Sequence, residues 1–146
     1  MTAANANGGP YLTAALICEK VLQEKDESLS IIRLVDRLTL TVQASHSPDT
    51  LPPFTVNLQA LISFKSGSAR GRNTVKWITE TPSGLRLPEQ LFPVLFEGED
   101  RGANLIITLN MTIDQEGVYW FHVLLENQPL TRIPLRILYQ RIGQNM

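Results

Sequence analysis

Residue types that often carry chemistry are scarce in this sequence, which contains one cysteine and two histidines among 146 residues. The lone cysteine, Cys18, excludes an internal disulfide, and a chain without disulfides is typical of a reducing cytoplasm. Cys18, His46 and His122 are scattered along the chain, so they show none of the spacings expected of metal ligands. The sequence therefore predicts no metal site, no cofactor and no catalytic residue.

Long apolar runs and a surplus of one charge are also missing. No apolar run approaches the roughly 20 residues that a membrane-spanning helix requires, and residues 1–10 lack the basic and apolar regions of a signal peptide. The net charge is −1, which argues against nucleic-acid binding. We expect a cytoplasmic protein that binds no membrane, with a flexible tail at residues 1–10, a single domain at residues 11–140 and a short tail at residues 141–146.

Alternation of apolar and polar residues is the strongest signal that the sequence does contain. Within residues 54–65 every even position is apolar, and within residues 104–114 the odd positions are apolar instead. Side chains alternate between the two faces of a strand, so each segment predicts a strand with one buried face. Further strands are predicted at residues 12–24, 29–42, 73–80, 118–125 and 132–139.

Prolines and one misplaced aspartate modify this pattern. Asp36 lies on the apolar parity of residues 29–42, which predicts a bend where the chain passes from one sheet to the other. Residues 85–98 contain two prolines and are expected to be irregular apart from one short strand. Pro134 cannot donate a backbone hydrogen bond, so the last strand is predicted at a sheet edge.

About eight strands without an amphipathic helix predict an all-β fold, an immunoglobulin-like or Greek-key two-sheet sandwich of about seven to nine strands. Residues 118–125 are apolar on both faces, which indicates a central strand with the last strand as its hairpin partner. Asp114, Gly117 and Tyr119 resemble the tyrosine corner of immunoglobulin-like domains, in which the tyrosine hydroxyl bonds to backbone upstream. Phe121 stands where antibody domains have a cysteine, so this resemblance implies architecture and no immune function.

A wider pattern resembles an uncharacterised family of small bacterial β-sandwich proteins. It consists of Cys18 followed by Glu19, a hairpin leading through residues 29–32 to Asp36, and Pro134 followed by Leu135 in the last strand. The resemblance covers about residues 14–138. It implies the sandwich fold and a bacterial source, and it brings no activity with it because the family has none assigned.

The most suggestive polar segment is residues 66–72, which contains two glycines and two arginines. Glycines let backbone N–H groups approach an anion, and the guanidinium groups of Arg70 and Arg72 can hold a phosphate or a carboxylate. The segment lacks the ending and the strand-to-helix setting of a P-loop. It predicts either an anion site at Arg70 and Arg72 or a solvated hairpin tip.

An uninterrupted apolar run occupies residues 91–96, and one face of a strand cannot hide all of it. Part of the run is expected to be exposed, with Phe92, Val94 and Phe96 as candidate interface residues. The alternative is a segment that caps one end of the sandwich. His122, in contrast, alternates with apolar neighbours on a central strand, which predicts a structural, hydrogen-bonded side chain.

Together these observations favour a non-catalytic interaction module that offers strand edges and loops to a protein partner or to a second copy of itself. One alternative is a module that binds a ligand, an anion or a carbohydrate, through a concave aromatic or arginine-lined surface that only Trp77, Trp120 and residues 66–72 could supply. Another is a structural subunit of a larger assembly such as a phage or secretion particle. An enzyme has the least support, and no motif indicates a specific small-molecule ligand.

Overall fold

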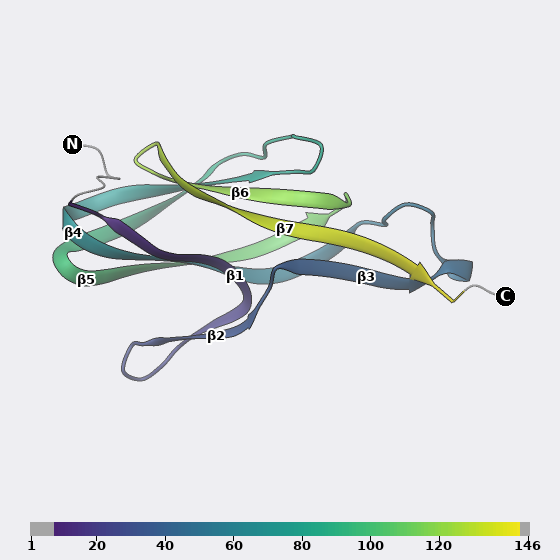
Figure 1. Cartoon of the computed structure of the whole chain (residues 1–146), viewed down its shortest axis with the longest axis horizontal. Coiled ribbons are helices and arrows are strands. Elements are labelled where there is room, and N and C mark those ends of the chain that lie inside the picture. The colour runs from purple at the N-terminus through teal and green to yellow at the C-terminus, as the bar shows by residue number, and fades with distance from the viewer. Residues whose placement is uncertain (1–7, 144–146) are drawn as a thin grey trace.

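The computed structural model describes residues 8–143, and nearly all of this range is β-structure (Figure 1). Its only helix is a single 3-10 turn, η1 (Ala44–His46), and none of the described residues form a helix that is long and apolar enough to cross a membrane. The predicted tails fall partly on residues 1–7 and 144–146, which lie outside the described residues. The strands, in chain order, are β1 (Tyr11–Gln23), β2 (Leu29–Leu34), β3 (Arg37–Gln43), β4 (Phe54–Glu80), β5 (Gln90–Ile113), β6 (Gly117–Leu125) and β7 (Gln128–Ile142).

Two long strands turn one hydrogen-bonded sheet into a sandwich. β4 has 27 residues and β5 has 24, and they pair antiparallel along their length except for register shifts between Lys65 and Arg70. Such shifts bend a strand and increase its twist. The β4–β5 hairpin therefore folds over on itself, at the left of Figure 1, and each strand contributes one half to each layer.

The two layers can be followed from the strand pairing. Layer 1 has the order β2, β1, first half of β4 and second half of β5. Layer 2 has the order β3, β7, β6, second half of β4 and first half of β5. Seven strands thus supply four segments to layer 1 and five to layer 2. The predicted all-β two-sheet sandwich is confirmed, and β6 is central as its sequence indicates.

The chain passes from layer 1 to layer 2 at Asp36, as predicted. β2 ends at Leu34 on the edge of layer 1, whereas β3 begins at Arg37 and pairs in parallel with β7 from Arg136 to Ile142. Consecutive hairpins produce only antiparallel pairs, so this parallel contact between an early strand and the last one requires a crossover. The crossover closes the sandwich on the side away from β5.

Tyr119 forms the predicted tyrosine corner at the start of β6. Its side chain is buried, and its hydroxyl accepts a hydrogen bond from the backbone N of Asp114 at 3.3 Å and donates one to Asp114 Oδ1 at 3.3 Å. Burial raises the pKa of the Tyr119 phenol, so the hydroxyl stays protonated and able to donate. The contact ties the β5–β6 connection to β6, which is the immunoglobulin-like feature of this sandwich.

The main core fills the space between the layers. Phe64 from layer 1 meets Phe96 from layer 2 edge-on, with 5.3 Å between the ring centroids, and Trp77 stacks on Phe121 within layer 2 at 5.2 Å. All four side chains are buried. Edge-to-face and stacked pairs add about 0.5–1.5 kcal/mol to the stabilisation that burial itself supplies. The Phe64–Phe96 contact thus joins the two layers, whereas the Trp77–Phe121 contact stabilises layer 2 itself.

A smaller cluster covers the outer face of layer 1. Cys18 is fully buried there with Val21 and Leu61, and Leu29 and Ile31 of β2 pack against them. β1 is therefore covered on both faces, with Ile17 in the main core and Cys18 in this smaller cluster. Burial raises the pKa of the Cys18 thiol, so this group is a small apolar side chain rather than a reactive thiolate.

Two segments that were expected to interrupt strands are themselves strands. Residues 66–72 do not form a loop or a hairpin tip. They form the bent middle of β4 and pair with β5. Residues 85–98 are not mostly irregular, because β5 begins at Gln90 and continues for the full length of both layers. Pro93 is tolerated because this half of β5 pairs only with β4 and forms the edge of layer 2.

The prediction that the last strand is an edge is wrong for its second half. β3 pairs with β7 from Arg136 onward and lies outside it in the sheet order. Arg136 and Ile137 pair with both β3 and β6, and the residues after them pair with β3 alone. The half that contains Pro134 pairs with β6 alone. The proline thus stands just before the β3 ladder begins, where the missing N–H group removes no hydrogen bond from the sheet.

Candidate functional site

The two arginines predicted to bind an anion lie in the bend of β4. Arg70 contacts the neighbouring strand β5, because its Nη1 donates a hydrogen bond to the backbone O of Glu97 at 3.0 Å. Its guanidinium also covers Gly98 so closely that a Cβ added to Gly98 would overlap the guanidinium. Arg72 is exposed and lies opposite Leu95. The geometry gives Arg70 a structural contact, and anion binding by the pair stays a prediction.

The apolar run in the first half of β5 does not expose the side chains predicted as an interface. Val94 and Phe96 are buried, and half-buried Phe92 packs against the same core. The exposed residues are Leu91 at 58% and Leu95 at 54%. Side chains in this half of β5 alternate between the core and the outer face, as in any strand with one buried face. Phe92, Val94 and Phe96 are on the core face, so the prediction that they form an exposed interface is wrong.

His122 and Glu80 form a polar pair on the outer face of layer 2. His122 Nε2 lies 3.0 Å from Glu80 Oε1, and Arg86 Nε lies 3.3 Å from the same oxygen. The hydrogen bond with His122 is the main cause that lowers the pKa of Glu80. The hydrogen-bonded role predicted for His122 is confirmed. Within residues 8–143 no three His, Cys, Asp or Glu side chains gather as metal ligands would.

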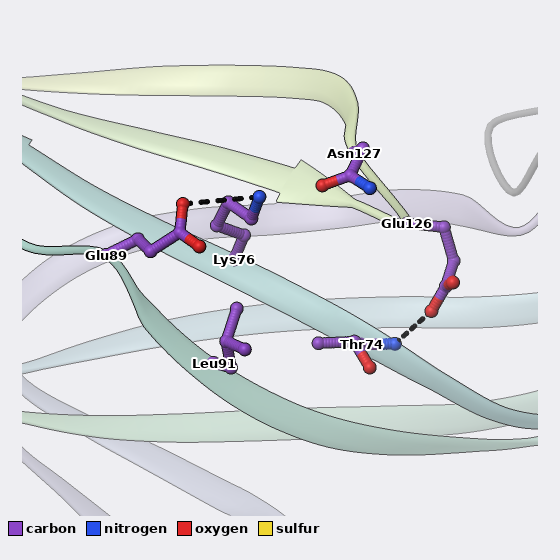
Figure 2. A pocket seen from close by; sticks show the side chains of 6 residues that line it. All are labelled: Thr74, Lys76, Glu89, Leu91, Glu126 and Asn127. Atoms are coloured by element: carbon purple, nitrogen blue, oxygen red, sulfur yellow. Dashed lines mark hydrogen bonds and ion pairs between the residues drawn. The ribbon is translucent and has the colours of Figure 1, made fainter.

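One hollow lies where the β6–β7 turn meets the edge of layer 2 (Figure 2). Its polar groups are already engaged, since Lys76 Nζ lies 3.2 Å from Glu89 Oε2 and the backbone N of Thr74 donates to Glu126 Oε2 at 2.5 Å. Glu126 N in turn donates to Thr74 O at 3.0 Å. Glu126 and Asn127 both have positive φ, as a type I′ hairpin turn requires. This hollow is therefore a structural junction that fixes the turn.

A different hollow, of about 430 Å³, lies on the outer face of layer 2, and we call it the Trp120 hollow. A half-buried tryptophan forms part of its wall, and the guanidinium Cζ of Arg132 lies 4.1 Å from the centroid of that ring. Ligand sites commonly combine apolar walls with a few charged groups. The lining residues come from β6, β7 and the start of β3: Asp36, Arg37, Val118, Trp120, Pro134 and Arg136.

A long free strand edge runs along residues 104–113, in the second half of β5, and we call it the β5 edge. These residues hold an unbroken register with β4, from Asn104 opposite Ser63 to Ile113 opposite Phe54, and pair with no other strand in the described part of the chain. They contain no charged residue and no proline. Their outward side chains are uncharged and polar except for Ile106, which is 38% exposed.

Trp120 is the one residue of these two features that the sequence indicates as a possible ligand contact. Trp120 and Arg136 lie on strands that alternate normally, and nothing in either strand alone indicates that β3 brings Arg37 beside them. The β5 edge was recognised as a strand, but its lack of a second neighbour is a property of the assembled sheet. The absence of charge within residues 104–113 was the one available signal.

Comparison with known proteins finds similar folds of low sequence identity. A β-glucosidase from Listeria innocua, in complex with glucose, is 9% identical with a TM-score of 0.45, covering 90% of this chain but only 17% of the enzyme. An immunoglobulin-like protein from Pseudomonas aeruginosa is 13% identical with a TM-score of 0.42, covering 91% of this chain and 99% of that chain. No curated protein matches the sequence. A sequence model of one protein family matches residues 13–138.

Proposed function

Because the chain belongs to a family of unknown function (DUF6941), we propose its role from its own surfaces: it is a non-catalytic interaction module whose partner at the β5 edge is a second copy of the chain. A bacterial cytoplasmic setting is part of the proposal. It is supported by the single, buried cysteine, since β-sandwiches in oxidising compartments commonly contain disulfides.

The observation that carries the proposal is that the β5 edge lacks the features with which proteins prevent unwanted strand pairing. The other edges have such features. The first half of β5 contains Pro93, β2 has six residues with a φ of 55° at Arg33, and β3 has seven residues and begins with Arg37. A long and uncharged edge presents backbone N–H and C=O groups at the spacing that a further strand requires.

A second copy can pair with this edge antiparallel about a two-fold axis at Thr108. Side chains alternate with a period of two, so a pairing centred on a residue keeps the apolar positions of both copies on the core face. Centring on Thr108 pairs residues 104–112 of the two copies, and no like charges meet. The opposed pairs include Leu105 with Met111, Ile107 with Leu109, and Thr108 with itself. Apolar pairs and Thr–Thr pairs are favourable cross-strand neighbours.

The substitution Thr108→Lys tests this pairing. Thr108 is exposed, so the free energy of unfolding of the monomer should change by less than about 0.5 kcal/mol. In the dimer, two introduced ammonium groups about 6 Å apart repel by about 3 kcal/mol at an effective dielectric constant of about 20. Dimerisation should therefore weaken by up to about 100-fold, less at high salt. Sedimentation velocity should show a wild-type dimer and a monomeric variant at the same concentration.

Thr55→Lys is the matched control, because Thr55 is exposed on the same face of layer 1 but lies on β4, one strand inside the edge. This variant should remain dimeric. A mixture of Thr108→Lys and Thr108→Glu should form a heterodimer, because the opposed charges then attract. A wild-type protein that stays monomeric at about 100 µM, or a mixture that does not associate, would overturn the proposal.

Ligand binding is a second candidate function, and a separate feature favours it. The Trp120 hollow is concave, partly aromatic and lined by two arginines. It lies on layer 2, whereas the β5 edge belongs to layer 1. The two functions therefore use different surfaces, and either can be tested without the other.

A further inference from the structure

Arginines without a carboxylate partner gather around the Trp120 hollow. Arg37, Arg132 and Arg136 form no ion pair with any residue in the range 8–143, although Asp36 lines the same hollow. Four other arginines do form ion pairs, all of them elsewhere on the surface: Arg33, Arg86, Arg101 and Arg141. The lining of the hollow thus contains two arginines and one carboxylate, a surplus of positive charge.

The strand register forces two of these arginines together. Arg37 in β3 lies directly opposite Arg136 in β7, and directly opposed side chains share a face about 5 Å apart. The next pair in the register, Leu38 and Ile137, belongs to the core, so both arginines point outward. Opposed like charges destabilise a sheet. An anion bound between the two guanidinium groups would remove this repulsion.

The remaining wall of the hollow is apolar. Trp120 lies opposite Pro134, and Val118 lies opposite Arg136. Arg132 stacks on the Trp120 ring, which restricts the orientation of the indole. A flat apolar group can therefore lie on this wall while a charged end reaches the arginine pair. The Asp36 carboxylate at the rim repels additional negative charge, which favours a monoanion over a phosphate dianion.

We propose that the Trp120 hollow binds a carboxylate that is attached to a flat apolar group. The carboxylate lies between Arg37 and Arg136, whose planar guanidinium groups match its two oxygens. The apolar group lies against Trp120 and Pro134. This site is independent of self-association at the β5 edge, so neither proposal stands or falls with the other.

Benzoate and benzamide are the matched probes, because they have the same shape and differ in charge. Each is titrated into the full-length protein while two-dimensional NMR follows the indole N–H of Trp120 and the Nε–H of Arg136. Benzoate should give saturable shifts of both signals, and benzamide should not. Arg136→Gln keeps a hydrogen-bond donor but removes the charge, and it should weaken benzoate binding about tenfold. Arg33→Gln, at an exposed arginine of β2 in layer 1, should leave binding unchanged.

Additional probes separate the possible sources of the carboxylate. Acetyl-phenylalanine resembles the C-terminal residue of a peptide, so tighter binding than benzoate supports a peptide C terminus as ligand, and weaker binding supports a small aromatic acid. Methyl phosphate that binds more tightly than benzoate would overturn the carboxylate assignment. Arg136→Lys keeps the charge and loses the planar fork, and intermediate affinity is expected for it.

Three results would overturn the proposal as a whole. These are equal shifts with benzoate and benzamide, no saturable shift with benzoate, and an equal loss of affinity in Arg136→Gln and Arg33→Gln. Both arginines are exposed, so their variants should melt at the wild-type temperature in circular dichroism. A folded Arg136→Gln variant that binds benzoate like the wild type also contradicts the proposed site.

Discussion

Replacing Trp77 with phenylalanine should have one stabilising and one destabilising effect on the core of the protein. Trp77 is 1% exposed and stacks on Phe121 with 5.2 Å between ring centroids. Its indole Nε1 is buried and has no hydrogen-bond partner among the described residues. Trp77→Phe removes this unsatisfied donor and keeps a ring that can stack. It also removes apolar volume from a tightly packed position.

The two effects have similar magnitudes. A buried donor without a partner costs about 1–3 kcal/mol, and the substitution recovers this free energy. The smaller ring leaves about 35 Å³ empty, which costs about 0.9 kcal/mol, and it buries about 40 Å² less surface, which costs about 1 kcal/mol. The terms nearly cancel, so the free energy of unfolding of Trp77→Phe should lie within about 1 kcal/mol of the wild type. Trp77→Ala lacks the compensating ring and should lose about 3–5 kcal/mol.

Urea unfolding followed by far-ultraviolet circular dichroism measures both variants without relying on tryptophan emission. A loss of more than about 3 kcal/mol in Trp77→Phe would refute the reasoning, because it would show that the indole N–H is satisfied or that the shape of the indole dominates. A stable Trp77→Phe variant has a further use. It leaves Trp120 as the only tryptophan, so its fluorescence reports directly on the Trp120 hollow.

Backbone strain and a pH-dependent contact provide two further predictions. Gly117→Ala should destabilise the protein by about 2–4 kcal/mol, because Gly117 has a φ of +116° and an added Cβ would stand 2.9 Å from Pro82 Cβ. Gly71→Ala is the control, because Gly71 has a φ of +97° with open space around it, and this variant should lose only about 1–2 kcal/mol. Thermal unfolding measures both variants, and equal losses would contradict the steric argument. His122 lowers the pKa of the Glu80 carboxyl below 4.5, so at acidic pH Glu80 binds fewer protons in the folded state than in the unfolded state. The stabilisation by the His122–Glu80 contact is therefore present above pH 4.5 and is lost as the pH falls through the pKa of Glu80 in the folded state. In urea unfolding at a series of pH values, His122→Gln should therefore lose less stability on acidification than the wild type, and parallel curves would show that the contact has no such role.

Much of the fold could be predicted because its cause is local. The alternation in residues 54–65 depends on the geometry of a single strand, and the structure places those even positions in the core. The bend at Asp36 and the contact between Tyr119 and Asp114 involve residues close together in sequence, and both are confirmed. The resemblance to an uncharacterised family is confirmed as well, by the match to residues 13–138.

The predictions that failed depended on a distant partner. Residues 66–72 contain the composition of a loop, but pairing with β5 keeps them in a strand. Residues 91–96 show no alternation of polarity, so their sequence did not indicate which parity faces the core. Pro134 is compatible with an edge, and only the start of the β3 ladder at Arg136 shows where β3 replaces β7 as the outermost strand.

The inward and outward faces of most strands were determined by the amino-acid sequence alone, since a period of two needs no knowledge of the neighbouring strand. The two surfaces proposed for binding were decided by the tertiary structure. Arg37 meets Arg136 only because β3 crosses to the far end of layer 2, and residues 104–113 are free only because no other strand within residues 8–143 pairs with that side of β5. Strand pairing joins residues that are far apart in the chain, and local patterns of polarity carry no information about which strands become neighbours.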